Sequence, residues 1–197
     1  MQQRHSEPRP PRPTPADIQA AAGKTVPDVL APGLIVLFCG INPGLYSGAT
    51  GHHFARPGNR FWPALYRAGF TDRQLLAHED QSLVYYRCGI TNLVDRATAT
   101  AAALHEAELQ AGAVRLAAVV EQWQPTALAV LGITAYRTAF AQTRAVLGRQ
   151  PWPMGATEVW VLPNPSGLNA HYTVDDLAAI YREFRLAVTQ TSGFQPV

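Results

Sequence analysis

Four short apolar runs are spaced along the chain, at residues 34–39, 89–94, 127–131 and 158–162. Each contains β-branched side chains and is too short for a helix of ordinary length, which predicts strands buried on both faces. Between them, apolar positions at helical spacing predict helices over 59–68, from residue 71 onward, and over 104–123, 134–142 and 173–188. Strands that alternate with helices form right-handed crossovers. The pattern therefore predicts the α/β class, a three-layer αβα sandwich with a central, mostly parallel sheet.

The first 28 residues differ from the rest of the chain. Five prolines fall between positions 8 and 15, and proline lacks the backbone N–H that helices and sheets require. We expect a disordered, proline-rich tail over 1–28, with at most a short helix over 16–22. A single domain is then predicted over 29–197, and removal of the tail is expected to leave its activity intact.

Composition excludes several classes of protein. The 197 residues are 47% hydrophobic and 15% charged, with a formal net charge of +2, so charge alone does not indicate a nucleic-acid partner. The two cysteines form no disulfide framework, and no spacing of Cys and His predicts a metal site. The longest apolar run is too short to span a membrane. We expect a cytoplasmic protein without a membrane partner.

Polar loops follow the predicted strands at residues 40–59, 95–100 and 163–172. The carboxyl ends of parallel strands form the binding cleft of such sheets. The first loop opens with Gly-Ile-Asn-Pro-Gly at 40–44, which matches neither the dinucleotide fingerprint nor the phosphate-binding P-loop. Asn42 therefore either faces a ligand or caps its own backbone in a tight turn.

Several motifs together resemble one family. Residues 40–44, Arg-Pro-Gly-Asn-Arg-Phe-Trp at 56–62, the segment 86–96 and Asn-Pro-Ser-Gly-Leu at 164–168 are similar to the mismatch-specific uracil-DNA glycosylases and the related thymine-DNA glycosylases. The resemblance covers roughly residues 29–188. It implies the uracil-DNA glycosylase-like fold and a monofunctional, monomeric DNA repair enzyme without a cofactor. Such an enzyme flips uracil, preferably opposite guanine, out of double-stranded DNA and hydrolyses its N-glycosidic bond.

The resemblance also implies roles for particular residues. Asn42 matches the residue that orients the attacking water, and Phe54 matches the aromatic ring on which the base stacks. Leu168 matches the wedge that fills the gap left by the flipped nucleotide. Further matched positions line the base pocket or meet DNA; they are Ile41, Gly44, Ser47, Asn164, Ser166, Gly167 and Asn169.

Two positions, Tyr46 and Ala170, depart from the pattern of the bacterial relatives. Tyr46 replaces a small residue and is expected either to narrow the pocket or to add stacking. His53 resembles the thymine-glycosylase branch, and we interpret it as a solvated loop histidine in preference to a contact with base or water. Ala170 replaces a basic residue, so one contact to guanine or phosphate is expected to be missing.

Charged residues in the loops are further candidates. An asparagine cannot accept a proton at ordinary pH, so Asp95 is considered as a general base. The structural alternative is an ion pair of Asp95 with Arg96 or Arg60, or a cap of the following turn. Arg56, Arg60, Arg87 and Arg96 are candidates for phosphate contacts.

The sequence is compatible with three other functions. One is a catalytically inactive DNA-binding relative, and another is a broad uracil-DNA glycosylase that also acts on U:A pairs and single strands. The third, an unrelated α/β hydrolase, is disfavoured because no G-x-S-x-G elbow is present.

Overall fold

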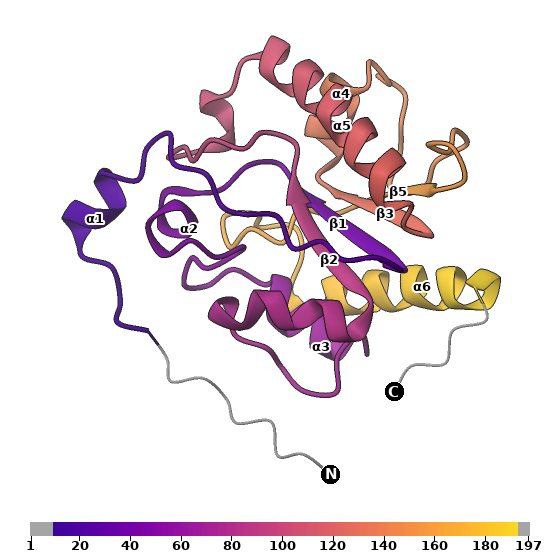
Figure 1. The fold of residues 1–197 in the computed structure, drawn as a ribbon, viewed down its shortest axis with the longest axis horizontal. Helices are drawn as coiled ribbons and strands as arrows, with labels where there is room; N and C mark the ends of the chain where they lie inside the picture. The colour runs from indigo at the N-terminus through magenta and orange to yellow at the C-terminus, as the bar shows by residue number, and fades with distance from the viewer. Residues whose placement is uncertain (1–9, 193–197) are drawn as a thin grey trace.

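A five-stranded sheet forms the centre of the computed structural model, which describes residues 10–192 (Figure 1). Its strands lie in the order β2-β1-β3-β5-β4. The bounds are Val36–Gly40 for β1, Cys88–Asn92 for β2, Ala127–Leu131 for β3, Gly148–Arg149 for β4 and Glu158–Leu162 for β5. Neighbouring strands are parallel except β4, which pairs antiparallel with β5. The chain leaves β1 toward β2 and returns to β3 on its other side, so the sheet has a switch point beside β1.

Helices follow each of the parallel strands. Their bounds are Pro15–Gln19 for α1, Leu45–Thr50 for α2, Phe61–Arg67 for α3, Glu106–Trp123 for α4, Ile133–Ala139 for α5 and Val174–Ser192 for α6, with 3-10 helices η1 at Ala77–Tyr86 and η2 at Ala101–Ala103. No helix among the described residues is long and apolar enough to cross a membrane.

The two faces of the sheet carry separate apolar cores, because side chains alternate along β1. Val36 and Phe38 join the core beneath α3 and α6, where the ring of Phe38 meets that of Phe61 edge-on at 5.4 Å. Leu37 and Cys39 join the opposite core beneath α4 and α5. Figure 1 shows these helix pairs on opposite sides of the sheet. The predicted three-layer, mostly parallel α/β architecture is confirmed.

Most strands lie where the apolar runs predict them. β3 and β5 have the predicted bounds, whereas β1 and β2 are shifted by one or two residues. The helix expected from residue 71 is wrong in its start, because Thr71 Oγ1 donates to the Arg73 carbonyl and closes a turn. Helix α2 and strand β4 were not predicted. At the start of α6, Thr173 Oγ1 accepts from the Asp176 N–H, which is the predicted N-cap.

The boundary predicted at residue 29 falls too late, because residues 14–29 pack on the domain as a strap. Thr14 and Asp17 form a capping box at α1, so the last proline of the cluster begins a helix. Ala21 and Val26 are buried. Gly23 N–H donates to the Ala97 carbonyl at 2.9 Å, and Ala97 N–H returns a bond to Lys24 at 2.7 Å. The part of the predicted tail at residues 1–9, and the domain end at 193–197, lie outside the described residues.

Candidate active site

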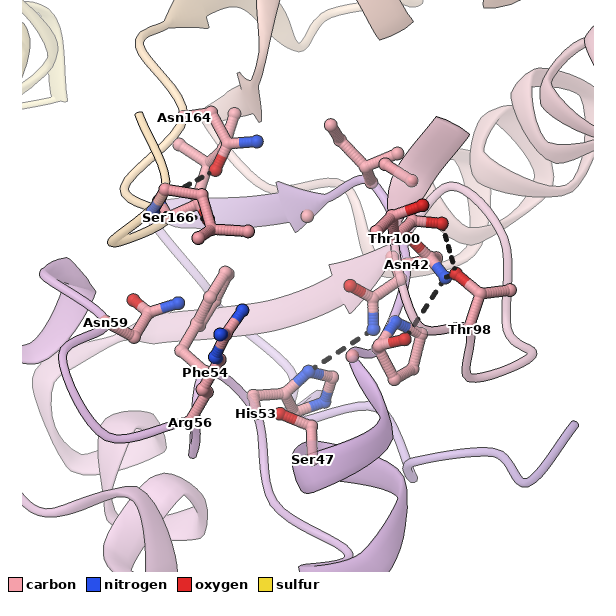
Figure 2. A pocket seen from close by; sticks show the side chains of 18 of the residues that line it. Asn42, Ser47, His53, Phe54, Arg56, Asn59, Thr98, Thr100, Asn164 and Ser166 are labelled. Atoms are coloured by element: carbon pink, nitrogen blue, oxygen red, sulfur yellow. Dashed lines mark hydrogen bonds between the residues drawn. The ribbon is translucent and has the colours of Figure 1, made fainter. Parts of the chain in front are cut away.

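A cavity of about 250 Å³ opens at the carboxyl edge of the sheet (Figure 2). That volume is space for about eight waters at roughly 30 Å³ each, which is enough for one pyrimidine. All four parallel strands reach it at their ends or in the loops that follow. Its lining includes Ile41, Asn42, Ser47, His53, Phe54, Arg56, Asn92, Asn164, Ser166 and Leu168.

The amide of Asn42 is held in one orientation. Its Nδ2 donates to Thr98 Oγ1 at 2.7 Å and to the Arg96 carbonyl at 3.1 Å, and Thr98 Oγ1 donates in turn to the Thr100 carbonyl. Figure 2 shows Asn42 beside Thr98 and Thr100 at the edge of the cavity. A carbonyl can only accept, so Nδ2 must face Arg96 and Oδ1 is left as an acceptor. Asn42 also donates to the Pro43 carbonyl, but it does not merely cap its own turn.

Phe54 forms an aromatic wall of the cavity. Its ring stacks on Phe61 with centroids 4.1 Å apart, and its backbone adopts a left-handed φ of 53°. An aromatic residue rarely takes this conformation, and the surroundings must impose it. The buried hydroxyl of Ser47 accepts from Ala55 N–H at 3.1 Å, while Trp62 Nε1 donates to the His53 carbonyl. These contacts fix the loop on both sides of Phe54.

A buried carboxylate supports the same loop from behind. Asp80 on η1 is 1% exposed and accepts from the His53 backbone N–H at 3.0 Å. Its other oxygen lies 3.2 Å from His52 Nδ1. Asp80 therefore binds both ends of the His52–His53 pair and positions the residue that precedes Phe54.

The side chain of His53 is buried, contrary to the solvated loop histidine expected. It is 2% exposed, with Nε2 2.9 Å from the Pro27 carbonyl and Nδ1 3.4 Å from Asn92 Nδ2. Burial lowers the pKa of His53, an effect that the Pro27 carbonyl and the carboxylates of Asp80 and Asp28 oppose. The interpretation failed because the strap that covers His53 was taken as disordered.

Asn92 is the most informative pocket residue that sequence reasoning missed. It ends β2 and is 5% exposed. Apart from its contact with His53, its side chain has no hydrogen-bond partner among residues 10–192. A Cβ placed on Gly40 would lie 2.4 Å from Asn92 Oδ1, so glycine at position 40 makes room for the Asn92 side chain. An amide at the end of an apolar strand is the signal that could have identified it.

The second motif forms a hydrogen-bonded loop, exposed at Gly167 and Leu168, on the opposite side of the cavity from His53 and Ser47 (Figure 2). Asn164 Oδ1 accepts from Ser166 N–H at 2.9 Å, and Asn169 Nδ2 donates to the Asn164 carbonyl at 3.1 Å. Leu168 lines the cavity and is 68% exposed, although a leucine packed for stability would be buried.

Arg60 braces this loop. Its guanidinium donates to the carbonyls of Gly167, Asn169 and Tyr172. These contacts occupy the group that was predicted to bind phosphate. Gly167 packs against the Gly58 carbonyl, and a Cβ there would lie 2.6 Å from that oxygen. The loops containing the two motifs are thus joined by backbone contacts.

Besides Arg60, three predicted charged residues do not line the cavity. Asp95 pairs with Arg115 at 2.6 Å, and neither with Arg96 nor with Arg60. Arg96 forms a two-point ion pair with Glu108, which helps to lower the pKa of Glu108 to about 2.

The third, Arg87, lies before β2, at the amino edge of the sheet, and donates to the Gly33 carbonyl. Tyr46 on α2 is also absent from the lining.

The ion pair also affects the titration of Asp95. Partial burial raises the pKa of Asp95, and Arg115 opposes that rise. The predicted site thus divides into residues at the cavity and residues that fix its surroundings.

Arg56 is at the cavity, as predicted for a phosphate contact. Its side chain is exposed, lines the rim and has no hydrogen-bond or ion-pair partner within the described part of the chain.

Asn59, Thr98 and Thr100 also line the cavity and were not singled out from sequence. Across residues 10–192, no group of three or more His, Cys, Asp or Glu side chains could hold a metal ion.

Fold and site together define an α/β protein with a pyrimidine-sized pocket at the switch point of its sheet. The family model of the Uracil DNA glycosylase superfamily matches residues 27–185. The chain therefore belongs to this superfamily, and membership supports excision of uracil from DNA.

A solved structure supports the same fold. It is the solution NMR structure of a candidate uracil DNA glycosylase from Methanosarcina acetivorans, which is similar with a TM-score of 0.56 and 19% identity. The match covers 83% of this chain and 98% of that one.

Proposed function

We propose that this protein is a monofunctional DNA glycosylase that hydrolyses the N-glycosidic bond of uracil, preferentially where uracil lies opposite guanine. One observation carries the proposal. A single cavity combines an aromatic wall, a buried amide at Asn92 and a second amide, Asn42, whose oxygen is fixed as an acceptor. A base inside a duplex cannot reach such a cavity, so the nucleotide must be flipped out.

The cavity suits the two recognisable surfaces of uracil. The flat face of the base can stack on Phe54, a type of contact worth about 1–3 kcal/mol per base. The polar edge of uracil offers one donor, N3–H, beside one acceptor, O4. The Asn92 amide offers Oδ1 and the second hydrogen of Nδ2, which is the complementary pair. Asn92 is therefore assigned to reading the base.

Asn42 is assigned to the attacking water. Oδ1 accepts one hydrogen bond from the water and orients its oxygen toward C1′ of the sugar. The C1′–N1 bond breaks, and the departing base takes the bonding electrons. The water oxygen then bonds to C1′, its extra proton passes to solvent, and the base is protonated. Because an amide does not take the proton, catalysis rests on orientation and on fixed dipoles around the leaving base.

A simple hydrolysis is expected because no lysine lines the cavity. Strand cleavage by a bifunctional glycosylase requires an amine that attacks the sugar carbon. The sequence contains one lysine, Lys24, which lies in the strap and outside the lining. The product should be an abasic site in an intact strand.

The preference for guanine follows from the loop at 164–169. Leu168 is exposed beside the cavity and can enter the stack that the flipped base leaves. Backbone groups of Ser166 and Gly167 are then adjacent to the unpaired partner base. A panel of four substrates tests this assignment: uracil opposite guanine, uracil opposite adenine, single-stranded uracil, and thymine opposite guanine. We expect the first to be cleaved fastest, whereas equal rates for the three uracil substrates would indicate a broad glycosylase.

Ser47 is expected to disfavour thymine. Its buried hydroxyl lines the cavity. The methyl group of a bound thymine would lie against this hydroxyl and deprive it of polar contacts, which is unfavourable. One methyl in a pocket discriminates by about 1–3 kcal/mol, so Ser47→Ala should raise the thymine-to-uracil excision ratio about tenfold. Single-turnover rates on both mismatches give the ratio, with Thr50→Ala on the same helix as control. An unchanged ratio would contradict the placement of the methyl group.

Arg56 is expected to contact a DNA phosphate. Each neutralised phosphate contributes about 0.9 to the slope of log affinity against log salt. Arg56→Ala should therefore reduce the slope by about that amount, whereas Arg96→Ala, which removes a cation already paired with Glu108, should leave it unchanged. Titrations of uracil-containing duplex between 50 and about 200 mM salt measure both. If the two substitutions change the salt slope equally, Arg56 does not contact a DNA phosphate.

A further inference from the structure

We propose that the strap fixes His53 as its Nε2–H tautomer and that His53 thereby orients the Asn92 amide, so that the pocket accepts uracil and rejects cytosine. This inference rests on the proposed function for its substrate. It makes His53 a positioning residue and makes the strap a part of the base pocket.

The first contact determines the tautomer. His53 Nε2 lies 2.9 Å from the backbone carbonyl of Pro27. A carbonyl oxygen has no hydrogen to donate, so Nε2 must carry one. In the neutral ring Nδ1 then holds a lone pair. The ring is almost completely buried, and its neighbours Trp62 and Asp80 hold its backbone, so it cannot readily turn over.

The second contact determines the orientation of the Asn92 amide. Nδ1 is an acceptor and lies 3.4 Å from Asn92 Nδ2, so the amide is oriented with its nitrogen toward His53. Oδ1 is then left without a donor among the described residues and lies above Gly40 in the cavity lining. Uracil presents N3–H to such an oxygen. Cytosine presents an unprotonated N3 and an amino group there, which would leave two acceptors and two donors facing one another.

The strap also holds the backbone of Asn92. Asp28, the residue after Pro27, lies 3.5 Å from Arg115, and Arg115 donates to the Asn92 carbonyl as well as to Asp95. Val29 and Ile90 form an antiparallel bridge two residues before Asn92. The strap therefore contacts the side chain of Asn92 through His53 and its main chain through Arg115 and β2. Removal of residues 1–28, which from sequence was expected to be silent, would break the first two of these links.

Protonation of His53 would reverse the orientation of the Asn92 amide. With hydrogens on both nitrogens, Nδ1–H would face the Asn92 amino group, and the amide would have to rotate to offer Oδ1 instead. Burial lowers the pKa of His53, so the neutral ring persists to a pH below the ordinary histidine range. The charged or titratable groups around it are Asp28 on the strap, Asp80 on η1 and His52 on its own loop. Uracil excision should therefore fall on the acidic side, as pH drops through this lowered pKa.

The test begins with the wild-type chain free of DNA. Nitrogen-15 NMR of the His53 ring at neutral pH should show a protonated Nε2 and an unprotonated Nδ1, with the signal assigned from His53→Gln. The opposite tautomer, or a ring that is protonated at neutral pH, would overturn the proposal. This measurement requires no excision activity.

The second part uses His53→Gln in the full chain. The glutamine amino group can still reach toward the Pro27 carbonyl, but no acceptor remains for Asn92. The affinity ratio is measured on duplexes that hold non-hydrolysable 2′-fluoro-deoxyuridine or 2′-fluoro-deoxycytidine opposite an abasic site. We expect His53→Gln to reduce the preference for uracil about tenfold, the loss of roughly one oriented hydrogen bond, and to abolish the acidic fall of excision. His105→Gln, at the exposed start of α4, is the matched control and should retain both.

The outcomes separate this inference from the proposed function. If His53→Gln is folded and keeps both the uracil preference and the acidic fall, then His53 does not orient Asn92 and the inference is wrong. If instead the wild type shows the Nε2–H tautomer but releases no uracil from any DNA, the proposed function fails while the tautomer assignment stands.

Discussion

Asn42→Ala is expected to lower the single-turnover rate of uracil excision by about 10²- to 10³-fold, the range for loss of one fixed polar group at a reacting centre. The amide contributes through orientation: Thr98 and the Arg96 carbonyl hold Nδ2, and Oδ1 is left to align the water. Alanine removes that acceptor and leaves the rest of the cavity intact. Rapid-quench measurements on a U:G duplex with enzyme in excess report the step directly.

Asp95→Asn is the matched comparison for Asn42→Ala. Asp95 pairs with Arg115 and does not line the cavity, so its rate should stay within about threefold of wild type. A loss as large as that of Asn42→Ala would contradict the assignment, because it would show that a carboxylate acts as the general base. Thermal unfolding of both variants separates a catalytic loss from a loss of folded protein.

Gly40→Ala is expected to have the second large effect. The added Cβ would lie 2.4 Å from Asn92 Oδ1, closer than Cβ atoms come to any neighbour in real structures, and 3.4 Å from the Phe54 ring, which is an ordinary contact. Asn92 or the strand end must shift, and a displacement of about 1 Å in a positioned group can cost roughly 100-fold in rate. Excision should fall by at least that factor, with weaker binding of uracil-containing DNA.

Gly89→Ala provides the contrast on the neighbouring strand. Its Cβ would meet the Val29 carbonyl at 2.6 Å and the side chain of Leu34, away from the cavity. This substitution should lower the midpoint of thermal unfolding, and the protein that remains folded should lose much less excision than Gly40→Ala, because Val29 reaches Asn92 only through the backbone of Ile90. If Gly40→Ala retains wild-type excision, then Asn92 does not read the base in the position described.

The fold was largely predictable because parallel strands buried on both faces have short, continuous apolar sequences. The runs at β3 and β5 gave correct bounds because turn residues flank both. Strand β4 has two residues and forms only by pairing with β5, so no local sequence pattern predicts it. The strap was missed for a related reason: its proline density suggested disorder, whereas its order comes from tertiary contacts with Ala97, Ile90 and His53.

The candidate site was predictable where loop motifs carry it. Asn42, Phe54, Asn164 and Leu168 meet at one cavity, as expected for loops that leave the same edge of a parallel sheet. Charged residues were harder to place, because an arginine near a cleft in sequence can be consumed by local acceptors. Arg60 and Arg96 are held in this way, and only the structure distinguishes them from Arg56.

Release of free uracil tests the central claim most directly. A duplex with one uracil opposite guanine is incubated with excess wild-type protein, and both the released base and the strand are analysed with and without alkali. We predict one equivalent of free uracil per duplex and an abasic strand that breaks only after alkali treatment. Folded protein that binds this duplex yet releases no uracil would contradict the account and identify a DNA-binding relative without glycosylase activity.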